Sequence, residues 1–180
     1  MTQPEPFMIA KTLSVAAQSP CRSKRGVSLF NCRTGAFRGS GFNGPPRGAP
    51  CPDRDVCAGA CGQRCVHAEM RALRDAAVWA RYHQMDDIEL IHIELTDDGG
   101  VKPCSGPSCW QCAREVLDVE FVQGVWLYEE PQPTHVESLE SFGRWLSGEG
   151  QLKPSGSPAW RRYSAEEFYS ATLRNCGMKP

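Results

Sequence analysis

Apolar residues recur with a helical period in some parts of the chain and with a strand-like pattern in others, and the two patterns alternate. The helical spacing predicts helices over residues 5–18 and 66–81, and we expect a further helix from Cys109 to Glu120. β-prone apolar runs predict strands over residues 27–31, 37–42, 88–95 and 124–128. Because helices connect the later strands, we expect these to pair in parallel within a layered α/β domain.

The pattern is weaker in the last part of the chain, which we interpret as an extension. We expect a first domain over residues 1–130 and a C-terminal extension over residues 131–180. Within the extension, Glu137 to Leu146 favours a helix. Ser164 and Glu167 have the spacing of a capping box, which begins a final helix. The apolar stripe of that helix predicts that it docks against the core.

Composition and charge narrow the classes of function. The chain has 180 residues, of which 41% are hydrophobic and 23% are charged, as is usual for a globular protein. Its net charge of −1 gives no overall attraction to nucleic acid and favours a small-molecule substrate. No apolar run is long enough to span a bilayer, so we expect no membrane association. No export signal precedes the first helix, so we expect a cytoplasmic location.

Ten cysteines are the unusual feature of the composition. In a chain of this size without an export signal, clustered cysteines favour metal ligation over disulfide bonds. Seven of them form two groups along the sequence, which are Cys51, Cys57, Cys61 and Cys65, then Cys104, Cys109 and Cys112. This clustering predicts at least one metal site.

Two short motifs at the starts of predicted helices carry the candidate chemistry, namely His67-Ala68-Glu69 and Cys109-Trp110-Gln111-Cys112. A catalytic zinc takes three nitrogen or sulfur ligands and leaves a fourth position to water, which then ionises near neutral pH to hydroxide. Two cysteines three residues apart at a helix start reach one ion, and the helix dipole favours their thiolates. We therefore predict a catalytic zinc on His67, Cys109 and Cys112, with Glu69 transferring protons.

Four stretches of the chain resemble the deoxycytidylate deaminase branch of the zinc-dependent cytidine deaminase superfamily. They are the two motifs above, Ser19-Pro20-Cys21 with Arg25-Gly26-Val27, and the segment from Gly41 to Gly48. This last segment, Gly-Phe-Asn-Gly-Pro-Pro-Arg-Gly, is similar to the Gly-Tyr-Asn-Gly-x-Pro-Arg-Gly loop that lines nucleotide sites in that family. The resemblance covers roughly residues 7 to 130.

The resemblance implies a fold, a reaction and several further contacts. The fold is a three-layer α/β/α cytidine deaminase-like fold with a mixed sheet of about five strands. The reaction is hydrolytic deamination of a cytosine nucleotide, with dCMP converted to dUMP and ammonia as the favoured case. Asn43 becomes a candidate contact to the sugar or base, and Arg47 a candidate contact to the phosphate. Because members of this superfamily often assemble, we also expect a homo-oligomer.

The cysteine pattern leaves two alternatives open. Ser108 stands where the family has Pro before Cys109, whereas a Pro–Cys pair occurs at Cys104, which is therefore a rival ligand. The helical pattern that continues after Cys112 favours Cys109 and Cys112. The first cysteine group either holds a second, structural zinc or consists of partly buried thiols; its members are Cys51, Cys57, Cys61 and Cys65.

Two other functions are compatible with the same zinc site. One is deamination of a base in single-stranded DNA or RNA, which is favoured by the basic and aromatic residues interleaved from Trp160 to Tyr163. The other is a non-catalytic zinc-binding module of the same fold. Glu69 disfavours that module, because a purely structural site has no use for a carboxylate beside His67. We interpret His92, in the central strand, as a hydrogen-bonded core or interface histidine.

Overall fold

The computed structural model describes residues 3–46, 49–50, 65–96, 98–104, 106–107, 109–129 and 159–179. The helices in these ranges are α1 (Pro6–Ala16), α3 (Ala68–Ala80), α4 (Trp110–Asp118) and α6 (Ala165–Asn175). The strands are β1 (Lys24–Asn31), β2 (Phe37–Phe42), β3 (Ile88–Leu95), β4 (Val101–Lys102), β5 (Val122–Glu129) and β6 (Ala159–Tyr163). None of these helices has both the length and the apolar character needed to cross a membrane.

The six strands form one mixed sheet with the order β2-β1-β3-β5-β6, and β4 pairs with β3 off this path. β3 and β5 run in parallel, as expected for strands that a helix connects. The other pairs are antiparallel. β3 pairs with β1 along its whole length and with β5 on its other side, so it is a central strand of the sheet.

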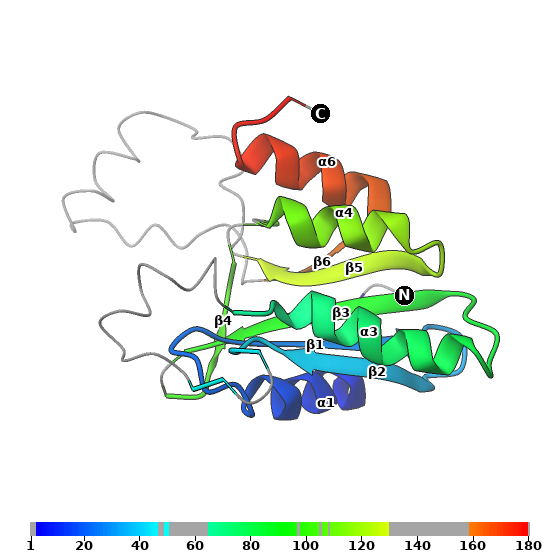
Figure 1. The fold of residues 1–180 in the computed structure, drawn as a ribbon, viewed down its shortest axis with the longest axis horizontal. Coiled ribbons are helices and arrows are strands. Elements are labelled where there is room, and N and C mark those ends of the chain that lie inside the picture. The colour runs from blue at the N-terminus through cyan, green and yellow to red at the C-terminus, as the bar shows by residue number, and fades with distance from the viewer. Residues whose placement is uncertain are drawn as a thin grey trace.

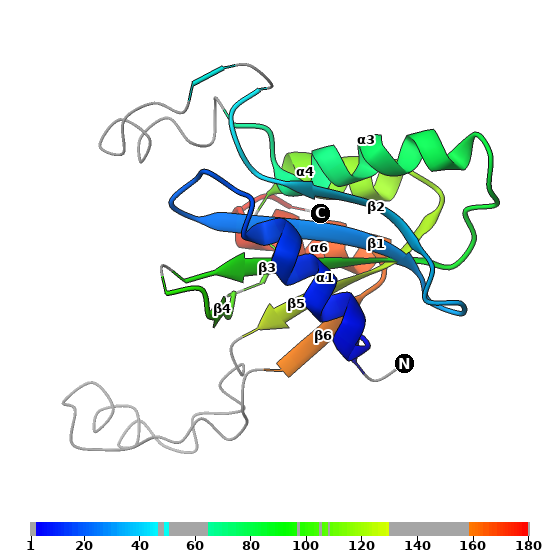
Figure 2. The same ribbon diagram turned by 90° about the horizontal axis from the view of Figure 1, so that it is seen from below.

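Side chains of the central strands alternate between the two faces of the sheet, and an apolar core covers each face. Ile91, Ile93 and Trp126 pack with Met8 and Ala16 of α1. The opposite face packs against α3, α4 and α6, and its core includes Val27, Leu29, Leu90, Val125, Leu127, Ala72, Val116 and Phe168. Figures 1 and 2 show α1 on one side of the sheet and the other three helices on the opposite side. The expected three-layer α/β/α fold with a mixed sheet is confirmed.

The last part of the chain joins the same sheet. β6, which the sequence pattern does not predict, pairs antiparallel with β5. The capping box begins α6, because the Ser164 hydroxyl accepts from the Glu167 backbone N–H at 3.2 Å and the Glu167 carboxylate accepts from the Ser164 N–H at 2.8 Å. The buried stripe of α6 faces α4 and β5. The boundary at residue 130 stays a prediction, and the helix expected over residues 137–146 lies outside the described ranges.

β2 lies directly against the first turn of α3. A side chain at Gly41 would not fit there, because its Cβ would lie 2.5 Å from the backbone oxygen of Ala68. The Asp75 carboxylate accepts a hydrogen bond from the backbone N–H of Ser40 at 2.9 Å, which adds a second link between this edge strand and α3. These contacts fix the start of α3 relative to the sheet, and this start carries the first of the two candidate motifs.

Candidate metal centre and active site

The N-terminus of α3 holds the first motif. His67 is the N-cap residue, with an extended backbone, and Glu69 lies in the first turn. Val66 forms an isolated antiparallel bridge with Gly44, and its N–H donates to the Gly44 oxygen at 2.8 Å. The Arg71 guanidinium donates to the same oxygen at 3.2 Å. The segment after β2 is therefore hydrogen-bonded to Val66, which precedes His67, and to Arg71, which follows it.

The N-terminus of α4 holds the second motif. Cys109 is the N-cap residue, and its sulfur accepts a hydrogen bond from the backbone N–H of Cys112 at 3.4 Å. Cys112 is buried, whereas Cys109 is half-buried. The positive end of the helix dipole favours a thiolate at this position. Both sulfur atoms thus lie at the first turn of α4.

The structure brings His67, Cys109 and Cys112 together. The Nδ1 atom of His67 lies 3.1 Å from each of the two sulfur atoms, and the three ligand atoms all lie within 4.8 Å of one another. Imidazole nitrogen and thiolate sulfur are the donors that zinc prefers, and three of them leave one tetrahedral position open. This group is therefore suited to hold a metal ion. Cys104, the rival ligand, does not belong to the group.

Hydrogen bonds link the ionisation of the three side chains. A hydrogen bond from Cys112 lowers the pKa of the Cys109 thiol to about 4. The same contact raises the pKa of Cys112. The hydrogen bond with Cys109 also raises the pKa of His67. One thiolate between two proton donors is an arrangement in which a metal ion can take the place of the protons, since binding displaces them.

A cavity of about 300 Å³ lies beside this group. Glu69 and Cys109 line it, which places the predicted proton carrier and one predicted ligand on the same space. Leu127 of β5 and Phe168 of α6 supply apolar lining. The volume falls at the small end of the range of pockets that bind small molecules.

Three charged side chains of the sheet, Arg25, Glu94 and Lys102, line the same cavity. The Glu94 carboxylate accepts from the Arg25 Nε at 3.1 Å, from the Lys102 Nζ at 2.8 Å and from the Ser23 hydroxyl at 2.9 Å. Burial opposes the ionisation of Glu94, but the hydrogen bond from Lys102 and the charge of Arg25 outweigh it, so the pKa of Glu94 is lowered. With Glu69, the lining has two cations and two anions, and Arg25 and Lys102 are the groups on it that can bind an anionic part of a ligand.

His92 lies next to Glu69 on the cavity lining, with its Nδ1 atom 3.7 Å from the Glu69 Oε1 atom. Burial lowers the pKa of His92, so the imidazole is neutral at pH 7. Its Nε2 atom is buried and has no hydrogen-bond partner in the part of the chain that the structure describes. From the sequence we interpret His92 as a hydrogen-bonded core or interface residue, whereas the structure places it at the candidate site.

The side chain of Asn43, a predicted substrate contact, forms hydrogen bonds with other residues of the fold. Its Oδ1 atom accepts from the Ser19 hydroxyl at 2.7 Å and from the Arg25 N–H at 2.8 Å. Its Nδ2 atom donates to the Ser23 backbone oxygen at 2.7 Å. Asn43 therefore holds the segment that leads into β1 and positions Arg25 beside the cavity. A direct contact between Asn43 and substrate stays a prediction.

Several predicted site residues lie outside the described ranges; these are Arg47, Cys51, Cys57 and Cys61. Cys65, the remaining member of the first cysteine group, has its sulfur 3.9 Å from the sulfur of the buried Cys21. The second, structural zinc and the phosphate contact by Arg47 stay predictions.

The C-terminal part contributes to the site in a way that the sequence analysis missed. Phe168 lines the cavity, and the Asn175 side chain donates to the Pro107 backbone oxygen at 2.8 Å. Pro107 precedes Cys109 by two residues, so α6 is fastened to the segment that leads into the metal-ligand group. The apolar stripe of α6 was the available signal, but it does not reveal which residue of the stripe faces a cavity.

Side chains from Trp160 to Tyr163 contact other residues of the sheet. The Arg162 guanidinium donates to both Glu89 oxygens, with Nε at 3.1 Å from Oε2 and Nη2 at 2.6 Å from Oε1. Tyr163 is buried, and the Trp160 ring packs against Tyr128 with centroids 5.5 Å apart. These contacts disfavour the interpretation of this strand as a nucleic-acid surface, because Arg162, Trp160 and Tyr163 all contact other residues of the sheet.

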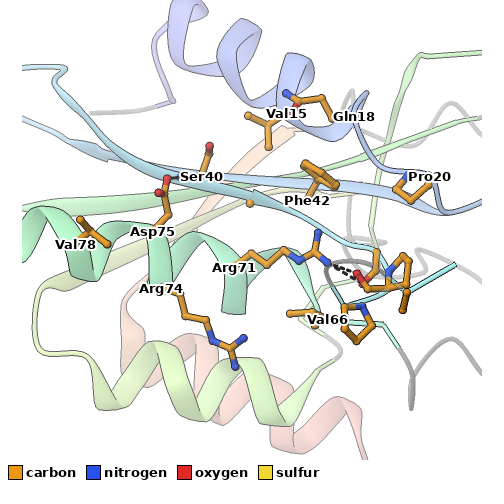
Figure 3. Close-up of a pocket in the computed structure, with 15 residues that line it drawn as sticks. Val15, Gln18, Pro20, Ser40, Phe42, Val66, Arg71, Arg74, Asp75 and Val78 are labelled. Atoms are coloured by element: carbon orange, nitrogen blue, oxygen red, sulfur yellow. Dashed lines mark hydrogen bonds between the residues drawn. The ribbon is translucent and has the colours of Figure 1, made fainter. Parts of the chain in front are cut away.

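A larger hollow of about 850 Å³ lies along β2, between the end of α1 and the outer side of α3. Figure 3 shows Arg71 and Asp75 of α3 on one side of it, Phe42 of β2 across from them, and the dashed bonds from Arg71 to the loop after β2. None of the three candidate metal ligands, His67, Cys109 and Cys112, lines this hollow. The candidate catalytic residues therefore lie at the smaller cavity, which Glu69 and Cys109 line.

The sequence matches no protein-family model and no curated protein. Among solved structures, the chain is similar to the dCMP deaminase of the cyanophage S-TIM5. The apo form shares 20% sequence identity over 64% of this chain and 78% of that chain, with a TM-score of 0.40. The complex with dCMP and dUMP shares 19% identity over 64% and 76% of the two chains, with a TM-score of 0.40. A likeness at this level carries no conclusion about the substrate of this chain.

Proposed function

We propose that the protein is a zinc-dependent hydrolase that deaminates a cytosine nucleotide, with dCMP converted to dUMP and ammonia as the favoured reaction. The observation that carries this proposal is the group formed by His67, Cys109 and Cys112, whose ligand atoms lie within 4.8 Å of one another at the edge of a cavity that Glu69 also lines. Zinc bound by these three side chains would supply the Lewis acidity that makes water nucleophilic near neutral pH.

Glu69 carries the protons in this reaction. Its carboxylate accepts the proton that the attacking water loses and delivers it to N3 of the cytosine ring. It then takes the proton of the new C4 hydroxyl group and delivers it to the amine on C4, which leaves as ammonia, so that one water and one cytosine give one uracil and one ammonia. The buried position of Glu69 suits this role, because few solvent molecules compete for its protons.

The rest of the cavity supports a nucleotide rather than a bare base. Leu127 and Phe168 offer apolar contact to a flat pyrimidine ring, while Arg25 and Lys102 offer positive charge to a phosphate. Asn43 and Arg47 are additional proposed contacts, on the basis of the resemblance of their loop to nucleotide-binding loops.

The test is ammonia release, with product identification by mass, from a panel of cytosine, deoxycytidine, dCMP, dCTP and a cytosine-bearing single-stranded oligonucleotide. Chelator-sensitive conversion of dCMP to dUMP supports the proposal. Turnover of the oligonucleotide alone would instead favour a nucleic-acid substrate. If the zinc-loaded protein releases no ammonia from any of these substrates, the non-catalytic module is favoured. The Glu69→Gln variant is the matched control, since it should retain bound zinc and lose turnover.

A further inference from the structure

His92 is a polar side chain in a row of aliphatic ones. In the register of the sheet it lies between Val27 of β1 and Leu127 of β5, and both of these belong to the apolar core. Placing an imidazole among such neighbours costs free energy unless a polar partner compensates. Since His92 also lines the cavity with Glu69, a role in the site accounts for this residue better than packing does.

The geometry points the imidazole at the Glu69 carboxylate. The Nδ1 atom of His92 lies 3.7 Å from the Oε1 atom of Glu69, which is longer than a hydrogen bond. It would need to shorten by roughly half an ångström to become one. Hydrogen bonds between catalytic groups are often long before substrate binds and tighten in the complex.

The surroundings of His92 also select its tautomer. A neutral imidazole has one N–H, and the partners of the two nitrogens decide where it lies. A proton on Nε2 would be a buried donor without an acceptor among the described residues, and it would leave a bare Nδ1 facing the carboxylate oxygen. A proton on Nδ1 avoids both penalties, because it points at Glu69 and leaves Nε2 as the unpaired acceptor.

We propose that His92 is a positioning residue for Glu69, in which the Nδ1–H group donates to the Oε1 atom and holds the carboxylate so that its other oxygen serves the substrate. This inference rests on the proposed function, because it gives Glu69 the role of proton carrier. It predicts that His92 contributes to the rate of the bound substrate's conversion rather than to substrate binding.

Three substitutions at this position separate positioning from packing. The amide nitrogen of Asn can occupy about the place of the imidazole Nδ1, the amide nitrogen of Gln lies nearer the place of Nε2, and Leu offers no donor. We expect His92→Leu and His92→Gln to lower kcat for dCMP about 10- to 100-fold with little change in KM. We expect His92→Asn to recover most of that loss. Zinc content and thermal unfolding of each variant show that fold and metal are retained.

Near-wild-type kcat in His92→Leu, or equal losses in the Asn and Leu variants, would overturn the proposal. A measurement independent of turnover is the ¹⁵N NMR spectrum of the imidazoles, which distinguishes a protonated from a bare ring nitrogen. The chain has 4 histidines, so the His92 signals can be assigned by their loss in His92→Asn. We expect a neutral His92 with its proton on Nδ1, and a proton on Nε2 would overturn the proposal. If the wild-type protein turns over no cytosine nucleotide, the proposed function fails, and the tautomer still decides whether His92 holds Glu69.

Discussion

The phenol of Tyr163 donates a hydrogen bond to the Glu129 carboxylate at 2.5 Å, and both side chains are buried. Burial and the neighbouring carboxylate raise the pKa of Tyr163, so the phenol keeps its proton and remains a donor. The bond joins the last residue of β6 to the last residue of β5, Glu129, whose backbone also forms an isolated bridge with Cys104. The last strand is thereby connected to the segment that leads from β4 toward Cys109.

We predict that Tyr163→Phe lowers the free energy of unfolding by about 1–3 kcal/mol, because it leaves the buried Glu129 carboxylate without this donor. Equilibrium urea unfolding measures the change. Tyr82→Phe is the matched control, since the Tyr82 side chain is 78% exposed and should be neutral. Equal stability of the two variants would mean that the hydrogen bond contributes nothing net.

The ion pair between Arg162 and Glu89 gives a second prediction about β6. Glu89 is buried, so Arg162→Met leaves its carboxylate without a counter-charge and should cost about 2–3 kcal/mol of stability. Arg161→Met is the control, because the Arg161 side chain is 55% exposed and contacts Glu129 only at 3.7 Å; it should cost less than about 1 kcal/mol. Urea unfolding of both variants decides, and a loss in Arg161→Met as large as in Arg162→Met would contradict this account.

The sequence predicted features that depend on neighbouring residues, and it missed features that depend on distant pairing. The helix starts that carry His67 and Cys109 follow from local spacing, and they were predicted to within a few residues. β6 was missed because its five residues become a strand only by pairing with residues of β5 that are 30 or more positions away. The same holds for β4, whose two residues pair with the end of β3.

Some residues of the candidate site can likewise be identified from the sequence, whereas others cannot. The motif residues can be named from the sequence because their spacing reflects the chemistry of zinc. The roles of His92 and Phe168 cannot, because a histidine in a strand and a phenylalanine in a helical stripe are usual core residues. Only the meeting of β3, β5 and α6 around one cavity places them beside Glu69.

Glu94 should make the stability of the protein depend on pH in acid. Its pKa is lowered in the folded state from an ordinary value of 4.5, so its contribution to stability is present above pH 4.5 and is lost as the pH falls through the folded-state pKa. We predict that Glu94→Gln is less stable than the wild type at pH 7, and that the difference shrinks as the pH is lowered from 5 toward 3. Urea unfolding at several pH values tests this, and a difference that is constant with pH would assign the effect to packing.

Removal of single cysteines should identify the metal ligands. We predict that Cys112→Ala loses one equivalent of zinc per chain relative to the wild type, together with activity, because two protein ligands hold the ion much more weakly than three. Cys104→Ala should keep its zinc, since Cys104 lies outside the ligand group. Metal analysis of the purified variants makes the comparison. Loss of zinc in Cys104→Ala with retention in Cys112→Ala would reassign the ligands.

Under the proposed function, Lys102 should determine how strongly the protein prefers a nucleotide to a nucleoside. Its ammonium group lies beside the cavity, 2.8 Å from Glu94, and Arg25 lies on the same lining. A phosphate that meets this positive charge gains a charge-assisted hydrogen bond, which is absent when deoxycytidine binds.

We therefore predict that Lys102→Met lowers kcat/KM for dCMP about tenfold and leaves kcat/KM for deoxycytidine nearly unchanged. Lys102→Arg should keep most of the preference because it keeps the charge. Lys11→Met is the matched control, since Lys11 lies on α1 and does not line the cavity. Steady-state kinetics on both substrates gives the ratio. An equal fall in kcat/KM for dCMP and deoxycytidine would mean that Lys102 supports the fold through Glu94 and does not bind the phosphate.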